Sequence, residues 1–149
     1  MPVPLPKDCD QIAQFAMSGE NRPAYFALRA LYDDEDGERN YLASLMNRGI
    51  SASSQTWGID RAAFVAYFES LATNRGGWDG EKRVASLDED LSIACTYESD
   101  HPAPLASFEV RLASDQYDPH WIAQVRVEVL AEFLGDLARR ARMFFGGSA

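Results

Sequence analysis

Three segments in the second half of the chain alternate apolar and polar residues, and this pattern constrains the fold most strongly. The segments span 91–97, 106–112 and 121–129. A period of two is typical of strands in an antiparallel sheet with one buried face. The apolar positions are Leu91, Ile93, Cys95 and Tyr97, then Ala106, Phe108, Val110 and Leu112, and then Trp121, Ala123, Val125, Val127 and Val129.

An amphipathic helix is predicted directly after the third of these segments. Its apolar face would consist of Leu130, Phe133, Leu134, Leu137, Ala138 and Ala141, which recur at helical spacing. Arg139, Arg140 and Arg142 suit the negative end of the helix dipole, and Gly146 and Gly147 would end the helix. We expect this helix to cover the apolar face of the meander.

The first half of the chain predicts further strands over 24–32, 40–46 and 50–57. An acidic turn over 33–38 would join the first two. A helix over 38–47 is the competing prediction, because its leucines and methionine also fit a helical face. A short helix over 8–17 is expected before these strands.

A second main helix is predicted to begin after Asp60. The Asp60 carboxylate can accept hydrogen bonds from the first helical turn. Ile59 and Phe64 occupy the positions of a hydrophobic staple around this cap. The apolar stripe would consist of Phe64, Tyr67, Phe68 and Leu71.

Together these elements predict an α+β fold. We expect a mostly antiparallel meander of about six strands, covered on one face by the two main helices. The length of 149 residues suits a single domain over 1–149. Residues 1–23 would form a partly ordered lead-in, because prolines alternate at its start, and residues 24–146 would form the core.

The charge balance restricts the classes of partner. The chain has 23 acidic and 14 basic side chains and a formal net charge of −9. Phosphate binding needs a basic face, so nucleic acid is not expected as a ligand. An acidic surface instead steers association toward a basic protein.

Other features of the sequence favour a cytoplasmic protein. No apolar run approaches the ~18 residues of a membrane span, and the start of the chain does not resemble a secretory signal. Cys9 and Cys95 are interpreted as reduced thiols, because disulfides are rare in the cytosol.

A segment in the middle of the chain carries a resemblance to a known family. The sequence GGWDGEK over 76–82 follows the helix ending FESLA at 68–72, and SLDEDL over 86–91 then opens the meander. Phe144 and Phe145 close the last helix. This combination resembles a family of small acidic bacterial proteins of unknown function, over residues 24–146. Departures from the family pattern are Val84, where a tryptophan is usual, and a longer segment around 97–104.

The resemblance implies a fold and no activity. Small acidic proteins of this general type are also similar to the immunity proteins of bacterial toxin systems.

No catalytic set, metal site or cofactor is predicted, and the chain is not expected to be an enzyme. The two histidines, His101 and His120, each lie beside an acid and a proline, as turn residues often do. A zinc or general-base site would require them to meet. Common metal, nucleophile and phosphate-binding motifs are absent from the sequence.

The candidate binding residues are acidic or aromatic. One group consists of Asp33, Asp34, Glu35, Asp36 and Glu38, and a second consists of Asp88, Glu89 and Asp90. Their spacing does not match an EF-hand calcium loop, and a solvated turn is the simpler explanation of each. Trp78 and Asp79 would form a third candidate, as an exposed aromatic anchor or as a turn in which the indole packs on the core.

Three functions are compatible with these features. We expect a non-catalytic protein that neutralises a basic toxin or effector through its acidic surface, in the manner of immunity proteins. The alternative is a small enzyme or ligand-binding domain with a pocket between helix and sheet, for which Tyr67, Tyr97, His101 and Asp118 are candidate liners. A phage-encoded acidic inhibitor is a further alternative.

Overall fold

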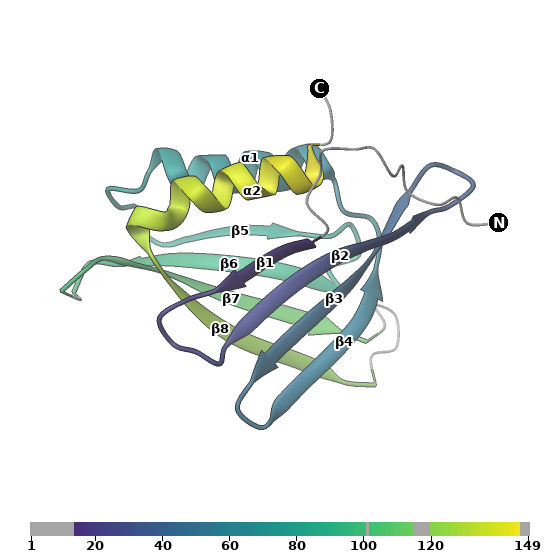
Figure 1. Ribbon diagram of the computed structural model, residues 1–149, viewed down its shortest axis with the longest axis horizontal. Helices are drawn as coiled ribbons and strands as arrows, with labels where there is room; N and C mark the ends of the chain where they lie inside the picture. Colours follow the sequence, from purple (N-terminus) through teal and green to yellow (C-terminus); the bar gives the residue numbers. More distant parts are fainter. Residues whose placement is uncertain (1–13, 101, 115–119, 147–149) are drawn as a thin grey trace.

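A computed structural model describes residues 14–100, 102–114 and 120–146. These residues form eight strands, two α-helices and one short 3-10 helix, arranged as two sheets with both helices on the same side (Figure 1).

The first sheet contains four antiparallel strands in sequence order. They are β1 (Gln14–Ser18), β2 (Tyr25–Asp33), β3 (Arg39–Asn47) and β4 (Ile50–Thr56). The strand at β3 confirms one of the two alternatives for this segment and excludes the helix. The helix predicted over 8–17 is wrong at its end, because residues 14–17 belong to β1 and pair with β2. The rest of that prediction lies outside the described residues.

The second sheet also contains four antiparallel strands in sequence order. They are β5 (Glu81–Ala85), β6 (Leu91–Glu98), β7 (Leu105–Ala113) and β8 (Ile122–Leu130). The three strands predicted in this half are confirmed as β6, β7 and β8. β5 is additional, and its charged sequence EKRVA gave no apolar alternation.

The predicted single meander of about six strands is wrong, because the strands form two separate sheets of four. The physical reason is helix α1 (Arg61–Thr73), which follows β4 and carries the chain to the far end of the molecule before β5 begins (Figure 1). β4 and β5 therefore do not become neighbours in one sheet.

The predicted start of α1 is confirmed. The Asp60 carboxylate accepts a hydrogen bond of 3.1 Å from the Ala63 amide, which satisfies one of the free donors of the first turn. Ile59 and Phe64 are both buried around this cap.

The last helix begins later than predicted. A 3-10 turn, η1 (Ala131–Phe133), precedes α2 (Leu134–Phe145). Leu134, Leu137, Ala138 and Ala141 are buried as expected, but Phe133 is 53% exposed. The tighter 3-10 turn places Phe133 out of phase with the apolar stripe of α2. No helix in the described ranges is both long and apolar enough to span a membrane.

One continuous cluster of buried side chains joins both sheets and both helices. At its centre Phe15 of β1 contacts Phe68 of α1 and Phe145 of α2, with ring centroids 4.9 and 5.6 Å apart. The two helices lie side by side over this cluster. On the opposite, outward side of the second sheet, Arg126 of β8 pairs with Glu109, its neighbour on β7, at 3.0 Å.

Candidate functional site

The β2–β3 turn presents the first acidic group in a fixed conformation. The Asp34 Oδ1 atom accepts hydrogen bonds of 2.9 Å from the amides of Asp36 and Glu38. The Asp33 carboxylate accepts two bonds from the Arg39 guanidinium, at 2.7 and 3.1 Å. These bonds with Arg39 hold the pKa of Asp33 below its ordinary value. Two carboxylates of the group therefore stabilise the turn.

The other three members of this group face solvent. Glu35, Asp36 and Glu38 are exposed at the tip of the turn. The bonds to Asp34 fix the backbone at Asp36 and Glu38, so the exposed carboxylates are carried by an ordered turn.

The second acidic group lies in the β5–β6 turn, residues 86–90, and its three members differ in burial. Asp90 is only 7% exposed. Its Oδ1 atom accepts hydrogen bonds from the hydroxyls of Ser86 and Thr56, so this carboxylate lies inside the structure. Glu89 is exposed and forms an ion pair of 2.9 Å with Arg83. Asp88 is half-buried.

Two exposed apolar side chains accompany these acids, and the sequence analysis did not single them out. Leu87 is 74% exposed, the highest fraction among the large exposed hydrophobic residues, and Trp57 is 43% exposed. The Leu87 amide donates a hydrogen bond of 2.8 Å to the Gly58 carbonyl, next to Trp57. The only sequence signal was a leucine inside an acidic turn.

These segments lie at the same end of the molecule. Figure 1 shows the β2–β3 turn, the β4–α1 link (57–60) and the β5–β6 turn at the end where α1 begins. We call these three segments the acidic end. The structure thus places two of the three predicted groups of site residues at the same end of the molecule.

The turn with Trp78 and Asp79 lies at the opposite end of α1 (Figure 1). Trp78 is half-buried, its Nε1 donates to the Cys95 carbonyl at 3.4 Å, and its ring packs on Tyr97 at 5.2 Å. Gly77 permits this contact, since it has a φ of 129° and a Cβ would approach the Tyr97 ring to 3.2 Å. Asp79 is exposed.

His101 and Asp118, two of the candidate pocket liners, lie outside the described residues. His120 is exposed, and its amide donates to the Ser114 hydroxyl at 2.9 Å. In the described ranges no group of three or more His, Cys, Asp or Glu side chains could hold a metal ion.

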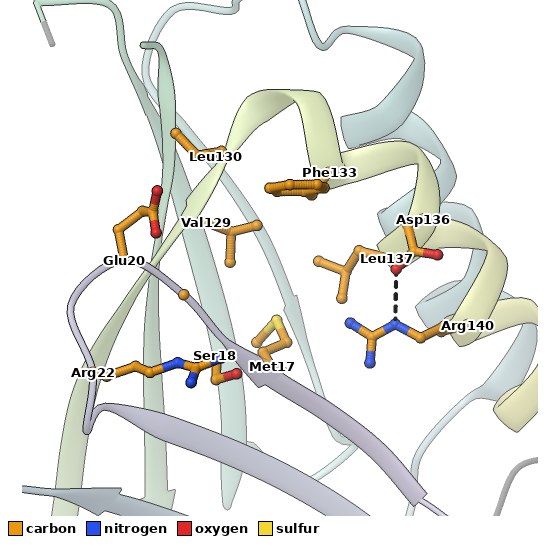
Figure 2. A pocket seen from close by; sticks show the side chains of 11 residues that line it. Met17, Ser18, Glu20, Arg22, Val129, Leu130, Phe133, Asp136, Leu137 and Arg140 are labelled. Atoms are coloured by element: carbon orange, nitrogen blue, oxygen red, sulfur yellow. Dashed lines mark ion pairs between the residues drawn. The ribbon is translucent and has the colours of Figure 1, made fainter. Parts of the chain in front are cut away.

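A cleft of about 370 Å³ lies between β1, the β1–β2 loop, β8 and α2 (Figure 2). Met17, Val129 and Leu137 form its apolar floor, and the Phe133 ring stands at its edge. Arg22 and Arg140 line it from the loop and from α2. The predicted liners Tyr67 and Tyr97 are not among its residues. The sequence analysis named a pocket between helix and sheet but not these residues, because the walls come from segments more than 100 residues apart.

The Arg140 guanidinium is anchored beside the cleft. Its Nη1 donates to the Ala16 carbonyl at 2.9 Å, and its Nε lies 3.3 Å from Asp136 Oδ2. Asp136 is also bonded by Arg139 at 2.6 Å, and these two arginines lower the pKa of the Asp136 carboxyl. Asp136 therefore remains charged and holds Arg140 in place.

Comparison with known proteins gives one match. A family model described as a family of unknown function (DUF6228) matches residues 17–148. The chain belongs to the DUF6228 family. This confirms the resemblance to an uncharacterised family, at that level of description.

No curated protein and no solved structure matches this DUF6228 chain. The family match covers both sheets and α2 except for the first residues of β1. It assigns no activity.

Proposed function

We propose that this DUF6228 chain is a non-catalytic bacterial protein of the cytoplasm that binds a basic toxin or effector and blocks it, as immunity proteins do. The observation that carries the proposal is the acidic end. There, exposed carboxylates on two turns lie at the same end as the exposed side chains of Trp57 and Leu87.

Charge and shape at the acidic end suit a protein partner. The net charge of −9 would accelerate association with a basic surface and make the association rate sensitive to salt. An exposed tryptophan and leucine supply apolar anchors, which contribute most of the affinity in many interfaces. The hydrogen bonds that hold both turns reduce the entropy lost on binding.

The experiment uses the products of the genes adjacent to this one in its source genome. Each product is expressed alone and with this chain, and growth of the host and complex formation are measured. We expect one product to be toxic alone, harmless in co-expression and bound to this chain with an association rate that falls steeply with salt. If no adjacent product binds, or if the bound product is acidic, the proposal is wrong.

Matched variants locate the interface. Asp36→Lys with Glu38→Lys should lower the association rate about tenfold or more, within the range of electrostatic steering. Asp79→Lys with Glu81→Lys changes the net charge equally at the far end and should have a much smaller effect. Leu87→Ser should increase the dissociation rate, and Ile122→Ser, another exposed apolar residue, should not.

The alternative class, a small enzyme or ligand-binding domain, gains support from one observation. A cleft of about 370 Å³ lies between α2 and the strands, within the size range of small-molecule sites.

A further inference from the structure

We infer that the cleft between β1, β8 and α2 binds a small organic anion with an apolar body, a carboxylate or a phosphate ester that carries a hydrocarbon group. This inference does not depend on the proposed function, because the cleft shares no residue with the acidic end.

The charge of the cleft differs from that of the whole chain. Its titratable liners are Arg22 and Arg140 against Glu20 and Asp136. Asp136 is already bonded to Arg139, outside the cleft, at 2.6 Å. With Arg139 included, three guanidinium groups lie with two carboxylates, in a chain whose acids outnumber its bases.

Both guanidinium groups have donors to offer. In the described part of the chain, Arg140 donates a hydrogen bond from Nη1, its Nε forms an ion pair with Asp136 but no hydrogen bond, and its Nη2 has no partner. Arg22 is exposed and forms no hydrogen bond or ion pair with the residues described. Figure 2 shows the two side chains extending toward the cleft from opposite walls. A guanidinium presents its donors in a planar fork that suits carboxylate and phosphate oxygens.

The floor of the cleft explains why the anion should carry an apolar body. Met17 and Leu137 are at most 2% exposed and Val129 is 6% exposed, so the floor consists of side chains of the core. Phe133 is 53% exposed and stands above this floor. A hydrocarbon group in the cleft would cover part of the Phe133 ring and remove apolar surface from water.

The wall opposite α2 is fixed to β8. The Glu20 amide donates to the Glu128 carbonyl at 2.8 Å, and the Asn21 side chain bonds the backbone of Arg126 and Glu128 at 2.8 and 2.9 Å. Gly19 allows this approach, because a Cβ there would lie 1.8 Å from the Glu128 carbonyl oxygen. The cleft is therefore formed before a ligand arrives, which favours binding.

The test titrates the full chain with octanoate, octyl phosphate and 1-octanol, by calorimetry and by the NMR signal of the Met17 methyl group. We expect saturable binding of one anion with a shift of the Met17 signal, and much weaker binding of octanol. Binding of octanoate alone identifies a carboxylate site, and binding of octyl phosphate alone identifies a phosphate site. If neither anion binds, or if octanol binds equally well, the inference is overturned.

Variants with matched controls complete the test. Arg22→Ala should weaken binding about tenfold or more, since a charge-assisted hydrogen bond is lost, whereas Arg48→Ala, an exposed arginine on the β3–β4 turn, should not. Phe133→Ala should weaken binding, and Ile122→Ala should not. All four residues are exposed, so their removal should leave the fold intact, which circular dichroism verifies. Equal affinities for Arg22→Ala and Arg48→Ala would overturn the assigned role of the guanidinium.

Discussion

The Thr56 hydroxyl donates a hydrogen bond of 3.0 Å to Oδ1 of Asp90, and this bond joins the end of β4 to the turn between β5 and β6. Thr56 is fully buried and Asp90 is 7% exposed. The Ser86 hydroxyl donates to the same oxygen. A buried carboxylate therefore connects the two sheets, in the same turn as the exposed Leu87. Its hydrogen bonds offset the loss of hydration.

Removal of this carboxylate should destabilise the fold. Asp90→Ala leaves the buried Thr56 hydroxyl without its acceptor and the Ser86 hydroxyl with only the bond of 3.3 Å to the Leu91 carbonyl. We expect a loss of about 2 kcal/mol in the free energy of unfolding. Urea denaturation measures it. Asp36→Ala, at an exposed acid, should change stability by less than about 0.5 kcal/mol. Equal stability of the two variants would contradict the role given to Asp90.

The paired phenylalanines of α2 should dominate its packing. Phe145 is 1% exposed and contacts the rings of Phe15, Phe64 and Phe144. Phe145→Ala should cost about 3–5 kcal/mol in denaturant experiments, since it leaves a cavity in the core. Phe133→Ala, 12 residues earlier and half-exposed, is the matched control and should cost far less.

Two buried tyrosines should respond in opposite ways to loss of the hydroxyl. The Tyr67 hydroxyl donates to the Lys82 carbonyl at 2.9 Å, so Tyr67→Phe should lower stability by about 1 kcal/mol. The Tyr41 hydroxyl is buried without a hydrogen-bond partner in the described part of the chain. Tyr41→Phe should therefore be neutral or stabilising, and thermal denaturation of both variants checks the difference in sign.

Tyr41 should also make stability depend on pH in alkaline solution. Burial raises the pKa of Tyr41 from its ordinary value of 10 to about 12. The unfolded chain loses this proton first, so the contribution of Tyr41 is present below pH 10 and is lost as the pH rises toward 12. The free energy of unfolding should fall over this interval, and less steeply in Tyr41→Phe. An unchanged slope would contradict the assignment to Tyr41.

Cys95 should be unreactive in the folded chain. Its side chain is fully buried, and burial raises the pKa of the thiol well above its ordinary value. The thiolate is the reactive species, so a Cys9→Ser variant should react with a disulfide reagent only as fast as the chain opens. Reaction at the rate of a free thiol in native buffer would show that the Cys95 side chain is accessible.

The sequence predicted the elements whose patterns are local and regular. The apolar alternation at Ile93, Phe108 and Val127 identified β6, β7 and β8, and Asp60 identified the start of α1. β1 and β5 were missed because each has only five residues. In addition, the first three residues of β5 are charged, so the strand has no alternation of apolar and polar residues. Phe133 was misplaced because a 3-10 turn shifts the helical phase.

The candidate site was less predictable, because it depends on contacts between distant segments. The acids at 33–38 and 88–90 were visible in the sequence. The burial of Asp90 was not, because it depends on a hydrogen bond from Thr56, which belongs to the other sheet. The cleft joins Met17 and Arg22 to Leu137 and Arg140. No local pattern indicates that these residues meet.

The division into two sheets has a consequence for how the polypeptide can be cut. All strand pairing in the described residues joins neighbours within 14–56 or within 81–130. A break in the link over 74–80 would therefore leave every ladder whole inside one fragment. The two pieces would meet through the contact of Phe145 with Phe15 and through the hydrogen bonds that join Glu20 to Glu128, Gly58 to Leu87 and Thr56 to Asp90. Reassembly of the severed halves would therefore report on the contacts between the two sheets.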